Sequence, residues 1–273
     1  MKDLRETALA VKAASAELGL LGTEKRNAAL AAIADALMAH EADILAANEL
    51  DLADGRANGM SESMLDRLAL TSARIEGMAE GVRQLIALPD PVGEVVEEFT
   101  RPNGLRIRKV RVPLGVIGMI YEARPNVTVD TAAIALKTGN GILLRGSASA
   151  LRSNLALASA MRGALKSAGV PENALAVVED TAHESVDRML RMNDCVDVII
   201  PRGGAGLIRR VLETATVPVL ETGVGNCHVY LDESANYGMA EAIVVNAKTQ
   251  RPSVCNAMET LLVNSVWATA HLA

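Results

Sequence analysis

The sequence predicts an α/β protein whose main domain is a doubly wound parallel sheet. From residue 114 onward, short continuous apolar runs alternate with helix-like segments, and such runs are typical of parallel strands covered on both faces. Half of the 273 residues are hydrophobic, yet there are only one Trp, one Phe and three Tyr. Ala, Leu, Val, Ile and eleven Met must therefore fill the core, which favours helices packed on a sheet.

The part of the chain before the sheet predicts helices and then a hairpin. Up to about Leu88 the apolar residues recur at helical spacing, as at Leu30, Ile33 and Leu37. Residues 93–112 instead contain two strand-like runs that flank Asn103-Gly104. Because Asn-Gly favours the positive φ of a tight turn, this segment predicts a β-hairpin.

The remaining elements follow in alternation. Strands are expected at Val116–Ile120, Ile142–Leu144, Leu175–Val178, Val196–Ile200, Val217–Leu220 and His228–Leu231. Helices are expected at Val127–Lys137, Ser149–Ala168, His183–Arg191, Gly206–Thr214 and Ala235–Lys248. We therefore predict a nucleotide-binding domain over residues 1–234, with residues 235–273 beginning a second domain.

Charge and composition exclude several classes of function. The net charge is −6, and the one basic cluster, residues 101–111, alternates charged and apolar residues as a solvated strand does; a nucleic-acid partner is not expected. No apolar run is long enough to cross a bilayer, and the N-terminus lacks a signal-peptide core, so we expect a soluble, cytoplasmic protein. Three cysteines without a CxxC pair and four unclustered histidines predict neither a zinc site nor disulfides.

A glycine-rich turn is the first candidate for cofactor binding. The G-x-G-x-x-G fingerprint is missing, but Pro201-Arg202-Gly203-Gly204-Ala205-Gly206 follows a predicted strand and precedes a helix. Gly203 and Gly204 there would let backbone amides approach a diphosphate. An ordinary strand-to-helix turn explains the same pattern equally well.

The second candidate is Arg145-Gly146-Ser147, which ends a predicted strand. In dinucleotide-binding folds an acid near this place holds the ribose 2′-hydroxyl, whereas a basic side chain suits a 2′-phosphate. The arginine therefore favours NADPH over NADH. The alternative is an ordinary arginine at the end of a strand.

Among the three cysteines, Cys255 is the candidate nucleophile. Cys195 precedes an apolar strand and is expected to be packed, and Cys227 lies at the start of another strand. Cys255 lies in the polar loop Thr249–Asn256, near Arg251 and unpaired backbone amides that favour a thiolate. A free cysteine is more often inert, and the loop alone does not exclude that alternative.

Longer segments carry a resemblance to a known family. The segment TQRPSVCNAMETLLV resembles the nucleophile loop of the gamma-glutamyl phosphate reductases, a branch of the aldehyde dehydrogenase superfamily. The runs VPLGVIGMIYEARPNVTVDTAAIALKTGNGILLRGS, IPRGGAGLIRRV and VPVLETGVGNCHVYLD are similar to the same family. The similarity extends from Met1 to about Val263 and is far more specific than any single motif.

This resemblance implies an aldehyde dehydrogenase-like fold and a definite chemistry. Cys255 would attack glutamyl 5-phosphate, phosphate would leave, and the resulting thioester would be reduced with NADPH to glutamate 5-semialdehyde in proline biosynthesis. By matching motif positions, Asn126 and the Cys255 backbone amide would stabilise the oxyanion. Glu221 matches the general base of the superfamily, and Arg251 and Arg124 are candidates to bind the phosphate or α-carboxylate of the substrate.

The resemblance also implies partners and leaves alternatives. It implies a homo-oligomer, with the hairpin 93–112 as a possible oligomerisation element, and a functional link to glutamate 5-kinase. The family's chains continue beyond this one, so residues 235–273 would be an incomplete catalytic domain with Asn264–Ala273 divergent or truncated. The alternatives are an inactive cofactor-binding fragment and a related aldehyde or acyl-CoA dehydrogenase.

Overall fold

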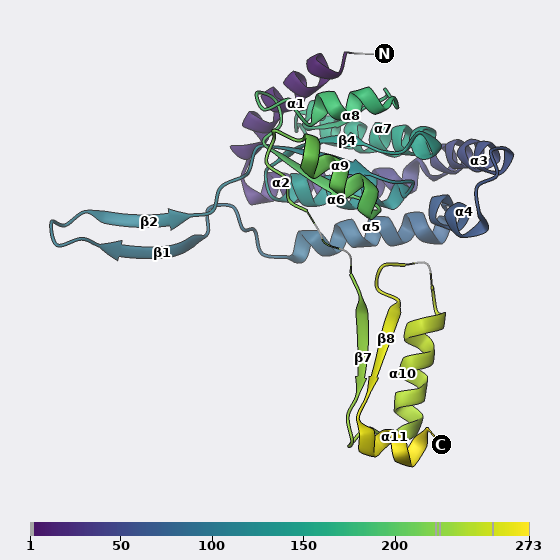
Figure 1. The fold of residues 1–273 in the computed structure, drawn as a ribbon. Helices are drawn as coiled ribbons and strands as arrows, with labels where there is room; N and C mark the ends of the chain where they lie inside the picture. The colour runs from purple at the N-terminus through teal and green to yellow at the C-terminus, as the bar shows by residue number, and fades with distance from the viewer. Residues whose placement is uncertain (1–2, 222, 224, 253, 273) are drawn as a thin grey trace. The chain divides into compact units, whose positions relative to one another are not determined.

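The computed structural model describes residues 3–221, 223, 225–252 and 254–272. It consists of two compact units, residues 1–222 and 223–273 (Figure 1). No helix within these described ranges is long and apolar enough to cross a membrane.

The first unit begins with the expected helices and hairpin. Its helices are α1 (Leu4–Gly19), α2 (Thr23–Ala39), α3 (Glu41–Ala57), α4 (Glu62–Leu68) and α5 (Ser72–Ala87). Strands β1 (Val95–Thr100) and β2 (Arg106–Val110) pair antiparallel with each other, and Gly104 in their turn has a φ of 85°. A side chain with a Cβ rarely adopts that φ, which explains the glycine.

Strands and helices then alternate as predicted. The elements are β3 (Val116–Tyr121), α6 (Pro125–Lys137), β4 (Gly141–Arg145), η1 (Ala148–Ala150), α7 (Leu151–Ser167), η2 (Glu172–Ala174), β5 (Leu175–Val177), α8 (His183–Met189), β6 (Val198–Arg202) and α9 (Ala205–Thr214). The four strands form a parallel sheet in the order β5-β4-β3-β6. The expected doubly wound α/β fold is therefore confirmed.

Both faces of the sheet are buried, each by its own cluster of side chains. In β3, Ile117, Met119 and Tyr121 face one cluster, whereas Val116 and Ile120 face the other. Alternate residues of a strand point to opposite faces, so a continuous apolar run serves two cores at once.

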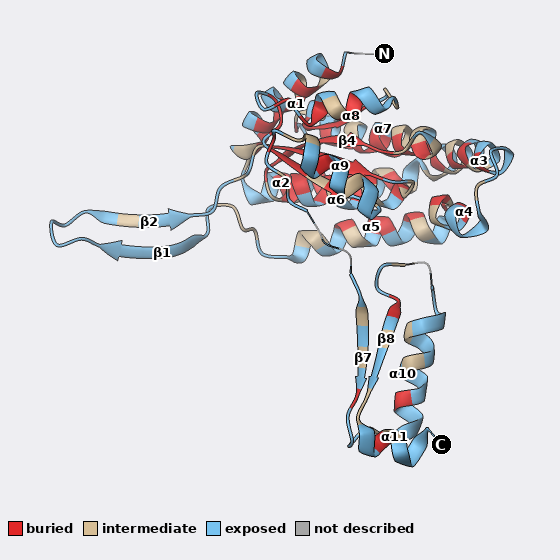
Figure 2. Cartoon of the chain, viewed as in Figure 1, coloured by how far each residue is buried: buried red, intermediate tan, exposed pale blue. Residues whose placement is uncertain are grey.

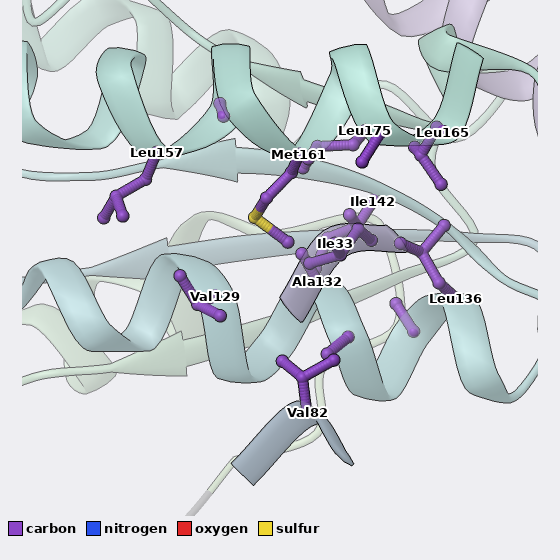
Figure 3. Close-up of a cluster of buried hydrophobic side chains, with 14 of the residues drawn as sticks. Ile33, Val82, Val129, Ala132, Leu136, Ile142, Leu157, Met161, Leu165 and Leu175 are labelled. Carbon is purple, nitrogen blue, oxygen red and sulfur yellow. The ribbon is translucent and has the colours of Figure 1, made fainter. Parts of the chain in front are cut away.

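In the larger core, α6 and α7 pack on the sheet, and α2 and α5 pack against these helices. Figure 3 shows Met161 and Leu157 of α7 directed towards Val129 and Ala132 of α6, with Ile33 of α2 close by. All five of these side chains are fully buried.

The second unit is small. It contains β7 (Cys227–Leu231), α10 (Tyr237–Thr249), β8 (Met258–Val263) and α11 (Ser265–His271). Strands β7 and β8 pair in parallel, and the small core comprises Leu231, Ala240 and Trp267. The two compact units divide between residues 222 and 223, and β7 pairs with β8 and not with the main sheet. The boundary at 234/235 between a nucleotide-binding domain and a second domain stays a prediction.

Two of the predicted strand positions differ from the structure. Residues 217–220 make only one bridge to the sheet, at Val219. Strand β6 begins at Val198, because the backbone N–H of Val196 donates to the carbonyl of Met192 (2.8 Å) in a turn. The Val196 N–H is used in this turn, so it cannot also donate a hydrogen bond within the sheet.

Candidate active site

The carboxyl ends of β3, β4 and β6 lie along one edge of the sheet, because all three strands are parallel. The chain runs from β3 through β4 to β5 on one side and then returns to β6 on the other side of β3. The order of the strands thus reverses between β3 and β6. In open α/β sheets, ligands bind in the crevice at such a reversal.

The predicted glycine turn lies at this reversal. Gly204 is the N-cap of α9 and contributes no side-chain cap. Glu122, directly after β3, accepts a hydrogen bond from the Gly204 N–H at 2.8 Å. A Cβ added to Gly203 would lie 2.9 Å from the Glu122 carboxylate and 2.7 Å from Leu207. Any larger residue at 203 would therefore displace its neighbours.

Glu122 is a site residue that the sequence analysis missed. Its carboxylate lies at the positive end of the α9 dipole, where an anion is stabilised. Its own N–H donates to the carbonyl of Arg202 at 3.2 Å, which joins the ends of the two strands. The sequence signal that could have identified it is an acidic residue two positions after the predicted strand Val116–Ile120.

Arg145 ends β4 as expected, but its side chain is buried and not presented to solvent. The guanidinium donates to the backbone carbonyls of Gly146 (3.0 Å), Thr181 (2.6 Å) and Ala182 (3.2 Å). Burial lowers the pKa of Arg145, and the charge of Asp180 acts in the opposite direction. In this arrangement the arginine ties the end of β4 to the loop between β5 and α8, and contact with a phosphate requires exchange of these hydrogen bonds.

The two residues after Arg145 connect β4 to η1. Gly146 leaves no room for a side chain, since an added Cβ would clash with the Asn154 amide and lie 3.2 Å from the Tyr121 ring. Ser147 caps η1, and its hydroxyl lies 2.8 Å from that of Ser149. Close packing thus explains the glycine at 146, and capping of η1 explains the serine at 147.

Asn126 and Arg124 lie at the start of α6, close behind the end of β3. Arg124 is the N-cap of the helix, and its N–H donates to the carbonyl of Glu122 at 2.8 Å. Asn126 is exposed, and its side-chain amide donates to the Asp130 carboxylate at 3.2 Å. An asparagine amide has two N–H groups, so this hydrogen bond uses one of them.

The three cysteines differ in exposure. Cys195 is fully buried in the first unit, and burial raises the pKa of its thiol. In the second unit Cys227 is half-buried and Cys255 is exposed, in the loop between α10 and β8. Arg251 begins the same loop and is exposed. Exposure is therefore greatest at the predicted nucleophile.

Glu221 is exposed near the end of the first unit. Asn126, Arg124 and Glu221 belong to that unit, whereas Cys255 and Arg251 belong to the other. Their assembly into one site stays a prediction. Among the described residues, no group of three or more His, Cys, Asp or Glu is arranged to hold a metal ion.

Comparison with known proteins identifies the class. Residues 2–273 match the model of the aldehyde dehydrogenase family. The chain therefore belongs to the aldehyde dehydrogenase family.

Its relatives define the branch. The chain is 61% identical over 267 residues to the gamma-glutamyl phosphate reductase of Geobacillus thermodenitrificans, covering 98% of this chain and 64% of that protein. The crystal structure of gamma-glutamyl phosphate reductase from Thermotoga maritima superposes with a TM-score of 0.90 at 48% identity, covering 99% and 66% of the two chains. The corresponding structure from Saccharomyces cerevisiae gives 0.75 at 32% identity, covering 99% and 68%. Within its family, the chain groups with the gamma-glutamyl phosphate reductases.

The match covers only part of each relative. The chain spans about two thirds of the length of these relatives. Residues that complete their sites can therefore lie outside these 273 positions.

Proposed function

We propose that the protein reduces L-glutamyl 5-phosphate to L-glutamate 5-semialdehyde with NADPH, releasing phosphate, as a step of proline biosynthesis. The observation that carries the proposal is the exposed Cys255, within a chain 61% identical to a gamma-glutamyl phosphate reductase. Of the three thiols, Cys255 is the most accessible to a substrate.

Cys255 would provide covalent catalysis. Its thiolate attacks the acyl carbon, the bond to the phosphate oxygen breaks, and a thioester of the glutamyl group remains on Cys255. A thioester accepts hydride far more readily than a carboxylate does. The thiohemiacetal that forms on reduction then collapses to the aldehyde and releases the thiolate.

Each of these steps passes through an oxyanion, which needs hydrogen-bond donors held in place. The Asn126 amide at the start of α6 and the backbone N–H of Cys255 are the proposed donors. Arg251 and Arg124 are proposed to bind the phosphate or the α-carboxylate, since a guanidinium pairs with either in a bidentate manner. Glu221 is the proposed general base, a role needed when water or another nucleophile must be activated.

The cofactor proposal rests on the edge of the sheet between β3 and β6. The turn of Gly203 and Gly204 leads into α9 and has no side-chain cap from the N-cap residue itself. The Gly204 N–H donates to Glu122, so a diphosphate would bind the other backbone amides of this turn or displace the carboxylate. These features fit a dinucleotide. A bound nicotinamide cofactor would supply the hydride, and Arg145, with Gly146 and Ser147, is the proposed basis for preferring NADPH.

The hairpin β1–β2 supports a homo-oligomer. All residues of β1 and nearly all of β2 are exposed, including Val95, Val96 and Phe99 (Figure 2). Exposed apolar strands of this kind are typical of interaction surfaces. We also propose a cytoplasmic location and a functional link to glutamate 5-kinase, the supplier of the acyl phosphate.

The test uses the reverse reaction and a completed protein, in which residues 1–273 are joined to the C-terminal third of a relative. NADP⁺ reduction by glutamate semialdehyde should require inorganic phosphate and should not be supported by coenzyme A. Equal rates with coenzyme A in place of phosphate would instead identify an acyl-CoA dehydrogenase. Absence of turnover with either acceptor would contradict the proposal.

A further inference from the structure

Two of the three thiols are brought together by strand pairing in the second unit. Cys227 begins β7, and Cys255 comes shortly before β8. These strands are parallel neighbours, with Cys227 opposite Met258 in the register. The pairing therefore places next to each other two cysteines that are 28 residues apart in the chain.

The contact between them is direct. The Cys227 thiol donates a hydrogen bond to the backbone carbonyl of Cys255, with sulfur and oxygen 3.4 Å apart. A Cβ added to Gly225 would lie 3.7 Å from the same oxygen. The carbonyl and thiol of Cys255 belong to one residue in a loop, so the Cys227 sulfur lies beside the residue that it would join. Forming the bond requires rotation of the side chains and a shift of the loop. A disulfide requires Cα atoms roughly 4.4–6.8 Å apart.

Accessibility separates this pair from the third thiol. Cys255 is exposed and Cys227 is half-buried, so small oxidants can reach both. Cys195 is fully buried, and burial raises the pKa of its thiol, which disfavours the reactive thiolate.

We propose that Cys227 is a resolving thiol, which forms a disulfide with Cys255 once Cys255 has been oxidised by a peroxide. In the first step the Cys255 thiolate attacks one peroxide oxygen, the O–O bond breaks, and a sulfenic acid and a hydroxide or alkoxide form. In the second step the Cys227 sulfur attacks the sulfenic sulfur and water leaves. The two thiols are thereby oxidised by two electrons, and one peroxide is reduced.

The consequence rests on the proposed function of Cys255. In the disulfide, Cys255 cannot attack an acyl phosphate, so the protein is inactive until a thiol reductant breaks the bond. The disulfide also prevents further oxidation to the sulfinic and sulfonic acids, which are not reversed by ordinary thiols. Cys227 would thus convert an irreversible loss of the nucleophile into a reversible one.

The experiment does not depend on turnover. Trypsin places the three cysteines in separate peptides, 192–202, 211–248 and 249–273, because the bond between Arg251 and Pro252 resists cleavage. The purified 273-residue chain is treated with hydrogen peroxide, alkylated and digested without reduction. We expect a cross-linked pair of 211–248 with 249–273 that disappears after dithiothreitol treatment.

Variants test Cys227 as the resolving thiol, with Cys195 as the control. In Cys227→Ser, peptide 249–273 should accumulate sulfinic and sulfonic acid that dithiothreitol does not reverse, whereas Cys195→Ser should behave as the wild type. A mixture of ¹⁵N-labelled and unlabelled chains should give cross-links within one chain only. Equal irreversible oxidation of Cys255 in the wild type and Cys227→Ser, or cross-links only between chains, would overturn the proposal. If the cross-link forms but the completed protein lacks phosphate-dependent turnover, only the proposed function fails.

Discussion

At the scale of single residues, the environments of the three cysteines predict an order of reactivity. Cys255 is exposed, Cys227 is half-buried and Cys195 is fully buried with a raised thiol pKa. Alkylation with iodoacetamide should therefore modify Cys255 first and Cys195 last. Peptide mapping over a time course measures this order, and a Cys255 slower than the other two would contradict the assignment of the nucleophile.

The same assignment predicts the effect of substitution. In the completed protein, Cys255→Ala should abolish reduction, because no thioester can form, while NADPH binding stays nearly unchanged. Cys195→Ser and Cys227→Ser are the matched controls and should retain activity under reducing conditions. Fluorescence titration of NADPH beside the turnover assay separates loss of chemistry from loss of binding. Substantial turnover by Cys255→Ala would exclude covalent catalysis by this residue.

Arg145 has two possible roles, which its variants can distinguish. If it also contacts a 2′-phosphate, Arg145→Gln should reduce the preference for NADPH over NADH by roughly tenfold or more, since a charge-assisted contact contributes about 1.5–3 kcal/mol. Loss of its bonds to three backbone carbonyls should also lower the melting temperature. A smaller folded fraction does not change the ratio of the dissociation constants for NADPH and NADH. This ratio therefore separates a role in recognition from a role in stability.

The exposed Arg191 provides a control, since Arg191→Gln should change neither the ratio nor the stability. A lower melting temperature with an unchanged ratio for Arg145→Gln would show that Arg145 is purely structural.

At the scale of elements, α7 shows how the fold depends on helical spacing. Leu157, Met161 and Leu165 recur every four residues and are all fully buried. Met161→Ala should destabilise the chain by about 2–5 kcal/mol, because it leaves a cavity in the larger core. The exposed Lys166 on the same helix gives the control Lys166→Ala, which should change stability by less than about 0.5 kcal/mol. Urea unfolding followed by circular dichroism measures the stability of both variants. Equal unfolding midpoints for Met161→Ala and Lys166→Ala would contradict this packing.

The hairpin β1–β2 is the element expected to mediate association. Replacing Phe99 and Val110 with Glu introduces charge into its exposed apolar surface and should shift the protein towards monomer. Glu97→Gln on the same strand is the control and should leave association unchanged. Light scattering after size-exclusion chromatography reports the mass of each species. An unchanged mass for the double variant would show that the hairpin is not the interface.

The sequence predicted the types and order of the elements, because apolar runs and helical spacing act locally. The ends of elements depended on caps and turns. Helix α6 begins at Pro125 and not at the predicted Val127, since proline is favoured at the first helical position. Helix α10 begins at Tyr237, because the Asn236 side chain accepts a hydrogen bond from the Met239 N–H.

The candidate site was less predictable, because its contacts are not local. Glu122 meets Gly204 only because β3 and β6 are neighbours in the sheet. The burial of Arg145 likewise depends on the loop after β5, which supplies the carbonyls of Thr181 and Ala182. Patterns along the chain indicated Arg145 and the glycine turn as candidates. They did not predict which residues these two features contact.

At the scale of the whole molecule, the second unit has little core for its size. Most of this unit is exposed (Figure 2). Its exposed apolar residues include Tyr230, Met239, Ile243 and Leu262, and the chain spans about two thirds of its relatives' length. We therefore predict that residues 1–273 alone bind NADPH weakly, show negligible turnover and associate through apolar surface. Joining the C-terminal third of a relative should restore solubility and turnover. Robust phosphate-dependent turnover by the 273-residue chain would show that these residues form a complete active site.

The central claim, that Cys255 carries the glutamyl group, is tested most directly by a burst experiment on the completed protein. Glutamate semialdehyde and NADP⁺ are mixed without phosphate, so that oxidation leaves the acyl group on the enzyme with no acceptor. The claim predicts a rapid burst of one NADPH per active site, a glutamyl adduct on the peptide that contains Cys255, and steady turnover once phosphate is added. Sustained turnover without phosphate, or an adduct on any other residue, would contradict it.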